Sequence, residues 1–253
     1  MSGIWAAGFW GLVGGSALIL GAVIAYFVRL PQRLIASIMA IGSGVLISAV
    51  AFDLMDEAFK QGGFDSTAIG FLGGAAVYTA ANIVVSRRGA RHRKRSGSNP
   101  NERQPDAQSN SGAAIAIGAL LDGIPESVVI GVSLLGGGGV SAVTVAAVFL
   151  SNVPEGLSSA AGMKAAGRSA RYIFGVWGGI AIVSAIAAMI GNVALVGASP
   201  DLIAAVTAVA AGAILAMLVD TMIPEATEAT HDYSGLIAVI GFLGAFVLSK
   251  SGG

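Results

Sequence analysis

The segment Leu121–Ser127, Leu-Asp-Gly-Ile-Pro-Glu-Ser, and its near-copy Ser151–Gly156, Ser-Asn-Val-Pro-Glu-Gly, decide how the rest of the chain is interpreted. Each lies inside a hydrophobic stretch long enough to cross a bilayer, and each places a glutamate directly after a proline. A carboxylate at the centre of a membrane is costly unless something pairs with it, so it marks a functional site by default. Two such carboxylates, Glu126 and Glu155, indicate one shared cation site.

The composition is that of a membrane protein. The 253 residues are 55% hydrophobic and 11% charged, with a mean hydropathy of +0.81, whereas soluble domains carry about 25% charged residues. The 37 glycines favour close packing of membrane helices. There are no cysteines, which excludes disulfides and thiolate ligands.

Hydrophobic length predicts an all-α polytopic membrane protein, because about 20 apolar residues span the hydrocarbon. No alternating pattern typical of a barrel is present. We expect eight transmembrane helices, at Ile4–Val28, Leu34–Phe59, Thr67–Ser86, Ala113–Leu135, Val140–Met163, Tyr172–Val196, Leu202–Ala226 and Ser234–Ser249. They divide the chain into helices one to three (1–86), a polar connection (87–112), helices four and five with the candidate site (113–163), and helices six to eight (164–253).

The polar connection 87–112 begins with a run of arginines and continues in Ser, Asn, Gln and Pro. Such a composition cannot build a core, so we expect a disordered basic loop. Of the 14 Lys and Arg residues, all but Lys60 and Lys250 lie in or beside the odd-numbered connections. The positive-inside rule then places those connections in the cytoplasm and both termini outside a cell membrane, the inner or plasma membrane. We expect the first helix to be retained, because it lacks the features of a signal peptide.

An internal repeat is also visible. Gly44–Ala58 resembles Gly212–Ala226, with Gly and Glu 13 positions apart in both, and Gly70-Phe-Leu-Gly73 resembles Gly241-Phe-Leu-Gly244. Helices one to three therefore match helices six to eight around helices four and five. The two units lie five helices apart, so they cross the membrane in opposite directions. Inverted repeats are typical of secondary transporters, whose substrate site lies near the midplane.

The chemistry of the candidate site follows from its oxygen atoms. Asp122 and Glu126 are four residues apart and share a helix face. No Lys or Arg lies in the predicted spans, so we expect the missing positive charge to be a proton or a cation. Oxygen ligands at this density suit a divalent metal. The candidate metal ligands are Asp122, Glu126, Ser151, Asn152 and Glu155.

Further polar groups predict a pathway on either side of this site. One set of acidic residues lies at the outer end of helix two. A second set of polar residues extends from helix seven into the following loop. The candidate pathway residues are Asp53, Asp56, Glu57, Asp220, Glu225 and His231. We interpret the nearby Glu228 and Asp232 equally well as solvated loop charges.

These features together resemble the ZIP (Zrt/Irt-like) family of divalent metal transporters, in a divergent, prokaryotic-type form. The family has eight helices, a long variable third connection, and His-Asn-x-Pro-Glu-Gly or similar motifs in helices four and five. Ser151–Gly156 matches the second motif apart from its first residue, whereas Asp122–Ser127 matches the first only at Pro125 and Glu126. The resemblance implies that Glu126 and Glu155 are central metal ligands, with Asp122 replacing a histidine and Asn152 as a further ligand. It also implies import into the cytoplasm by alternation between outward- and inward-open states.

The departures from the family pattern modify these expectations. Gly123 and Ser151 stand where many members have stronger ligands, and Tyr172–Val196 contains no carboxylate for a second metal site. We therefore expect one metal site. Zinc is the first expectation on the ground of the family resemblance, but an all-oxygen site strengthens the case for manganese or ferrous iron as the transported metal. The metal is cargo, and no cofactor is expected.

Three alternatives remain open. In the first alternative, Glu126 and Glu155 bind no cation and are instead protonated and hydrogen-bonded between packed helices. The second is an intramembrane hydrolase that uses Asp122 with Asp220. The sequence contains no Gly-x-Gly-Asp, Gly-x-Ser-x-Gly or His-Glu-x-x-His motif, so we do not expect an enzyme. The third is a proton-coupled carrier or channel for another solute. Expected partners are the lipid bilayer, the metal ion and no nucleic acid, and spacings such as Gly70–Gly74 fit either internal packing or a homodimer.

Overall fold

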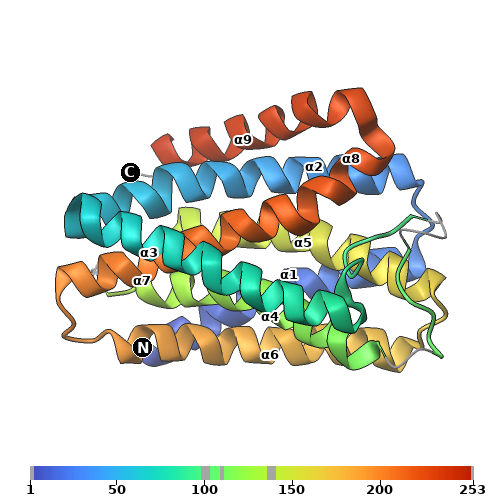
Figure 1. Cartoon of the computed structure of the whole chain (residues 1–253), viewed down its shortest axis with the longest axis horizontal. Helices are drawn as coiled ribbons and strands as arrows, with labels where there is room; N and C mark the ends of the chain where they lie inside the picture. The colour runs from blue at the N-terminus through green and yellow to red at the C-terminus, as the bar shows by residue number, and fades with distance from the viewer. Residues whose placement is uncertain (1–2, 98–102, 109–110, 136–140, 252–253) are drawn as a thin grey trace.

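The computed structural model describes residues 3–97, 103–108, 111–135 and 141–251, and within these ranges the fold is all-α without strands (Figure 1). Every helix predicted from hydropathy overlaps a helix of the structure. Residue 140, the predicted start of the fifth helix, lies outside the described residues, as do parts of the polar connection. The main helices are α1 (Gly3–Phe27), α2 (Gln32–Ala49), α3 (Met55–Val85), α4 (Gly112–Val132), α5 (Ala142–Ala165), α6 (Ala170–Ala194), α7 (Pro200–Met217), α8 (Ile223–Thr230) and α9 (Ser234–Ser251).

Five helical segments among the described residues are long and apolar enough to cross a membrane: Gly3–Phe27, Gln32–Ala90, Gly112–Val132, Ala170–Ala194 and Pro200–Ser251. Two of them are longer than one crossing needs, and each contains a backbone reversal. Gly63 interrupts the first with φ of 68°, and His231 interrupts the second with φ of 43°. Helices α2 and α3 consequently run in opposite directions in Figure 1.

Basic residues gather at one end of the bundle. Figure 1 shows both chain ends at the opposite end from the connection between α3 and α4. The connections after α1 and α5 lie at the same end as that connection. The residues in or beside these two connections include Arg29, Arg33, Lys164, Arg168 and Arg171, and we call this the basic end.

Close helix contacts recur in a matching pattern. A Cβ on Gly44 of α2 would collide with the backbone oxygen of Ala238 on α9, and a Cβ on Gly212 of α7 would collide with that of Phe71 on α3. Only glycine permits such an approach. Gly44 and Gly212 are the first residues of the two similar segments. Gly44 packs on α9, and Gly212 packs on α3.

Gly70 and Gly74 of α3 also pack within the chain. A Cβ on either would collide with the backbone oxygen of Ala205 or Val209, respectively, both on α7. This Gly-x-x-x-Gly spacing therefore serves internal packing here, one of the two uses expected from the sequence.

Two π-helical turns occupy matching positions. The turn η1 (Val50–Leu54) joins α2 to α3, and η3 (Leu218–Met222) joins α7 to α8. Their first residues are 168 positions apart, the same separation as between Gly44 and Gly212. π-Helical turns are rare and frequently lie at functional sites. Each of these two turns carries one candidate pathway aspartate, Asp53 in η1 and Asp220 in η3.

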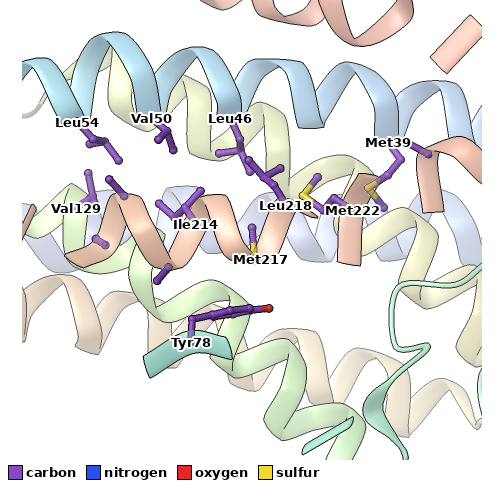
Figure 2. Close-up of a cluster of buried hydrophobic side chains, with 14 of the residues drawn as sticks. Met39, Leu46, Val50, Leu54, Tyr78, Val129, Ile214, Met217, Leu218 and Met222 are labelled. Carbon is purple, nitrogen blue, oxygen red and sulfur yellow. The ribbon is translucent and has the colours of Figure 1, made fainter. Parts of the chain in front are cut away.

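An apolar layer lies between α2, α4 and α7. Figure 2 shows Leu46, Val50 and Leu54 facing Val129, Ile214 and Leu218 across this layer. All six residues are buried.

Candidate carboxylate site

Two proline-containing helices hold the candidate ligands. α4 contains Pro125 and carries Asp122 and Glu126, and α5 contains Pro154 and carries Glu155. These three residues are at most 3% exposed. Proline lacks the N–H of one helical hydrogen bond, but both helices continue through it.

Asp122 is held by an arginine that the sequence placed in a loop. Nη2 of Arg93 donates to Oδ1 of Asp122 at 2.7 Å and Nε donates to Oδ2 at 2.8 Å. Tyr78 of α3 donates a third bond, from Oη to Oδ1 at 2.6 Å. Such a bidentate guanidinium–carboxylate pair is among the strongest side-chain contacts. Burial lowers the pKa of Arg93, but the charge and hydrogen bonds of Asp122, together with Tyr78 and Glu155, outweigh this effect and raise the pKa, so Arg93 stays cationic.

Lys94 connects the two helices. Its Nζ lies 2.9 Å from Oε2 of Glu155 and 3.4 Å from Oδ2 of Asp122, and the side chain is 3% exposed. The ammonium is thus shared by one carboxylate from each proline-containing helix. It occupies the space between the ligands that the sequence assigned to a metal.

The polar connection therefore differs from the sequence expectation over its described part. Residues 86–90 continue helically from α3 as η2 (Ser86–Ala90), and Arg93 and Lys94 enter the bundle. The expectation that no Lys or Arg neutralises the carboxylates is wrong, because two cations arrive from the flanking loop. Residues 98–102 and 109–110 of the predicted disordered loop lie outside the described residues.

Side chains of α5 fix this connection. Ser159 donates to the backbone oxygen of Arg93 at 2.6 Å, and Ser158 donates to that of Lys94 at 2.8 Å. The amide of Gln104, which is buried, donates to the backbone oxygens of Arg93 and Ser159 at 2.8 and 2.9 Å. The segment is thereby attached to the same helix that carries Glu155.

Glu225 of α8, a predicted pathway residue, belongs to the same arrangement. Its Oε1 accepts hydrogen bonds from the backbone N–H and hydroxyl of Ser96 and lies 2.8 Å from the hydroxyl oxygen of Ser158. Arg95 lies 3.9 Å from the other oxygen and 2.7 Å from Glu228. Glu228, interpreted from sequence as a pathway or solvated charge, is half-buried in an ion pair. The four successive residues Arg93–Ser96 thus each contact a carboxylate of the bundle.

Glu126 is the exception among the buried carboxylates. Neither of its oxygens has a hydrogen-bond partner within the described residues. Buried polar atoms are nearly always hydrogen-bonded, so a carboxyl group in this state requires an explanation. Within the same part of the chain, no three His, Cys, Asp or Glu side chains are grouped closely enough to hold a metal ion.

The two other predicted ligands point elsewhere. Nδ2 of Asn152 donates to the backbone oxygen of Gly14 on α1 at 3.0 Å. The hydroxyl of Ser151 donates to Val148 within its own helix at 2.9 Å. Both residues are buried. In this arrangement their donor atoms serve helix packing.

A cavity of about 540 Å³ lies at the end of the bundle opposite the basic end. Three predicted pathway residues line it, Asp53, Asp56 and Glu57. The hydroxyl of Ser249 donates to Asp53 at 2.6 Å, and Lys60 pairs with Asp56 at 2.7 Å. Val129 also lines this cavity and belongs to the apolar layer of Figure 2.

A second cavity, of about 380 Å³, lies at the basic end. Its walls include Lys94, Arg95 and Asp220. Asp220 accepts a hydrogen bond from Asn82 at 3.1 Å, so Asp122 and Asp220 bind different partners. The remaining predicted pathway residue, His231, is exposed at the turn between α8 and α9.

The loop cations were missed by the sequence interpretation. Arg93 and Lys94 lie in a nine-residue segment, residues 87–95, that is almost entirely basic, and hydropathy gives no sign that two of them are buried. The one available signal is the charge imbalance itself, since buried carboxylates require cations. Comparison of the sequence with models of known protein families gives no match, and comparison with curated proteins gives none either.

Proposed function

We propose that this chain transports divalent transition-metal cations across a membrane into the cytoplasm, through the site formed by Asp122, Glu126 and Glu155. The observation that carries the proposal is the burial of these three carboxyl groups on two proline-containing helices, with Glu126 lacking a hydrogen-bond partner among the described residues. An intramembrane carboxylate facing the bundle interior is a mark of ion pathways. The hard oxygen donors suit manganese or ferrous iron, and zinc remains the first expectation on the ground of the family resemblance.

We infer an eight-span topology with the basic end in the cytoplasm and both termini outside. The grouping of basic residues at one end supports this orientation under the positive-inside rule. The matching glycine contacts of Gly44 and Gly212, and the matching positions of η1 and η3, support an inverted repeat. In this topology the 540 Å³ cavity opens to the outside and the 380 Å³ cavity to the cytoplasm. The resemblance to the ZIP family rests on the motif residues and accords with this proposal.

Uptake into proteoliposomes tests the proposal. Zinc, manganese, ferrous iron, cadmium and magnesium are each offered to vesicles containing the wild-type chain or Glu155→Gln. We expect uptake of at least one transition metal by the wild type and its loss in the variant. Asp65→Asn, an exposed carboxylate outside the site, serves as the control and should transport normally. No uptake of any metal, or uptake unaffected by Glu155→Gln, contradicts the proposal.

A second candidate, a proton-coupled carrier or channel for another solute, is favoured by one observation. Arg93 and Lys94 already supply two positive charges, so a single proton, without a metal, completes the charge balance of the three carboxyl groups. The two candidates differ in their response to metal. A carrier of this second kind shows proton flux that depends on Glu126 but no saturable metal uptake.

A further inference from the structure

We propose that Arg93–Ser96 is a tethered cationic plug, which closes the carboxylate site from the basic end and holds the Lys94 ammonium where the transported cation binds. This inference rests on the proposed function. It adds a regulatory element that the transport proposal alone does not contain, because a transport site needs only the carboxylates.

The position of the ammonium is the first argument. Lys94 Nζ is the only cation of the described residues placed between a carboxylate of α4 and one of α5, at 3.4 Å from Asp122 and 2.9 Å from Glu155. A metal bridging the same two helices needs the same oxygens. Lys94 and the metal therefore compete for one position, which also accounts for the lack of a ready metal-binding cluster among the described residues.

The two loop cations differ in how firmly they are held. Arg93 makes two hydrogen bonds to Asp122 and further ones to Tyr78 and Asn82, at 2.9 Å each. Lys94 acts as a point charge, with ion-pair contacts and no hydrogen bond of normal geometry from Nζ among the described residues. Lys94 is therefore the member of the pair that a competing cation displaces.

The charges are consistent with exchange. Arg93 and Lys94 supply two positive charges for three carboxyl groups, so the site is balanced with the ammonium in place only while one carboxyl group holds a proton. Replacing the ammonium with one divalent cation balances the same three carboxylates and Arg93. Because an uncompensated charge is costly in a low-dielectric interior, a divalent metal is the better occupant when it is available.

The surroundings allow the plug to withdraw. Lys94 contacts the carboxylates on one side and lines the 380 Å³ cavity at the basic end on the other. Hydroxyls of Ser96, Ser158 and Ser159 hold the segment, and each is a neutral group that water can replace. Movement of Lys94–Ser96 toward the cavity, with Arg93 remaining on Asp122 as the tether, removes the ammonium and exposes the carboxylates to the basic end.

The first test locks the plug in place. Because the chain has no cysteines, Ser96→Cys combined with Ser158→Cys introduces a unique pair at two hydroxyls that lie against the same oxygen of Glu225. We expect a short thiol-specific crosslinker to join them in the full-length protein in vesicles. Metal uptake should stop after crosslinking and return with a reducible crosslinker once it is cleaved. Each single cysteine variant treated in the same way is the control and should remain active.

The second test removes the ammonium. Lys94→Gln should lower the apparent KM for metal, whereas Arg88→Gln, an exposed residue of the same basic run, should leave it unchanged. If the plug occupies the site about nine-tenths of the time, the decrease is about tenfold. Labelling of Ser96→Cys by a membrane-impermeant maleimide should also become faster when the transported metal is added.

The outcomes separate the two proposals. Failure of the cysteine pair to crosslink, a crosslinked protein that transports normally, or an unchanged KM in Lys94→Gln overturns the plug while uptake by the wild type still supports transport. If the pair crosslinks but the wild type takes up none of the five metals, the proposed function fails instead, and the segment is a fixed structural element.

Discussion

Arg93 and Asp122 form a buried ion pair of two hydrogen bonds, 2.7 and 2.8 Å long, between residues of which neither is more than 1% exposed. The pair joins a segment outside the predicted helices to the centre of α4. Desolvation of both charges is offset only while both partners are present. The pair therefore makes the position of the loop and the charge of the site depend on each other.

Removal of the guanidinium should destabilise the protein strongly. Arg93→Ala leaves Asp122 buried beside Tyr78 without its main counter-charge, and breaking one partner of a buried pair costs about 3–5 kcal/mol. Thermal unfolding in detergent measures the loss. Arg103→Ala is the matched control, because Arg103 pairs with Asp106 at the surface, where such contacts contribute about 0–1 kcal/mol. Equal effects of the two substitutions would contradict the central role of the Arg93 pair.

The hydroxyl of Tyr78 should contribute to the same site. It donates to Asp122 and accepts from Arg93 at 2.9 Å, so Tyr78→Phe removes two hydrogen bonds to charged groups while keeping the ring. We expect a loss of about 1.5–3 kcal/mol, the range for a hydrogen bond to a charged group. Unfolding in detergent again measures it, with Tyr233→Phe at an exposed position as the control. A stability equal to that of wild type would mean that Asp122 and Arg93 are satisfied without the hydroxyl.

The helices could be predicted from the sequence because lipid-facing and core-facing segments share one property, apolar composition over about 20 residues. The location of Glu126 and Glu155 inside such segments follows from the same property. Their burial together near Asp122 is in accord with the spacing of the two Pro-Glu motifs. The role of Asn152 as a ligand stays a prediction, since its amide Nδ2 donates to the backbone of α1. A residue's type does not reveal which neighbour it faces.

The burial of part of the loop could not be predicted, because its composition does not distinguish the basic residues that are exposed from those that are buried. Arg87 and Arg88 are exposed, whereas Arg93 and Lys94, a few positions later, are buried. An arginine can be buried only where a carboxylate pairs with it. The carboxylate that pairs with Arg93 belongs to Asp122, 29 residues away in the sequence. A local composition rule therefore predicted disorder for a segment that a distant charge orders.

The close contact between α1 and α5 should control the position of Glu155. A Cβ on Gly156 would collide with the backbone oxygen of Leu18, and backbone atoms cannot move aside as a flexible side chain can. Gly156→Ala should therefore cost about 1–3 kcal/mol through overpacking and should reduce metal uptake by displacing the adjacent glutamate. Gly178→Ala is the control, because no atom lies within 4 Å of its added Cβ. Unfolding and uptake are measured together, and a Gly156→Ala protein that matches the control in both would contradict the close packing of α1 on α5.

Glu126 and Glu155 should be separable by comparing stability with transport. Glu126→Gln removes a buried carboxyl group whose oxygens have no hydrogen-bond partner among the described residues, so stability without metal should be retained or increased. Glu155→Gln removes the partner of Lys94 and should cost about 3–5 kcal/mol. Both substitutions should abolish metal uptake, because both carboxylates are proposed ligands.

Thermal unfolding in detergent and uptake into vesicles, performed on the same preparations, decide between these expectations. A stable Glu126→Gln protein that still transports metal would remove Glu126 from the proposed site. If Glu126→Gln instead unfolds as readily as Glu155→Gln, Glu126 contributes to packing through a contact outside the described residues. Only loss of transport with stability intact identifies Glu126 as a group kept for binding the transported cation, because a residue needed for folding alone cannot produce that combination.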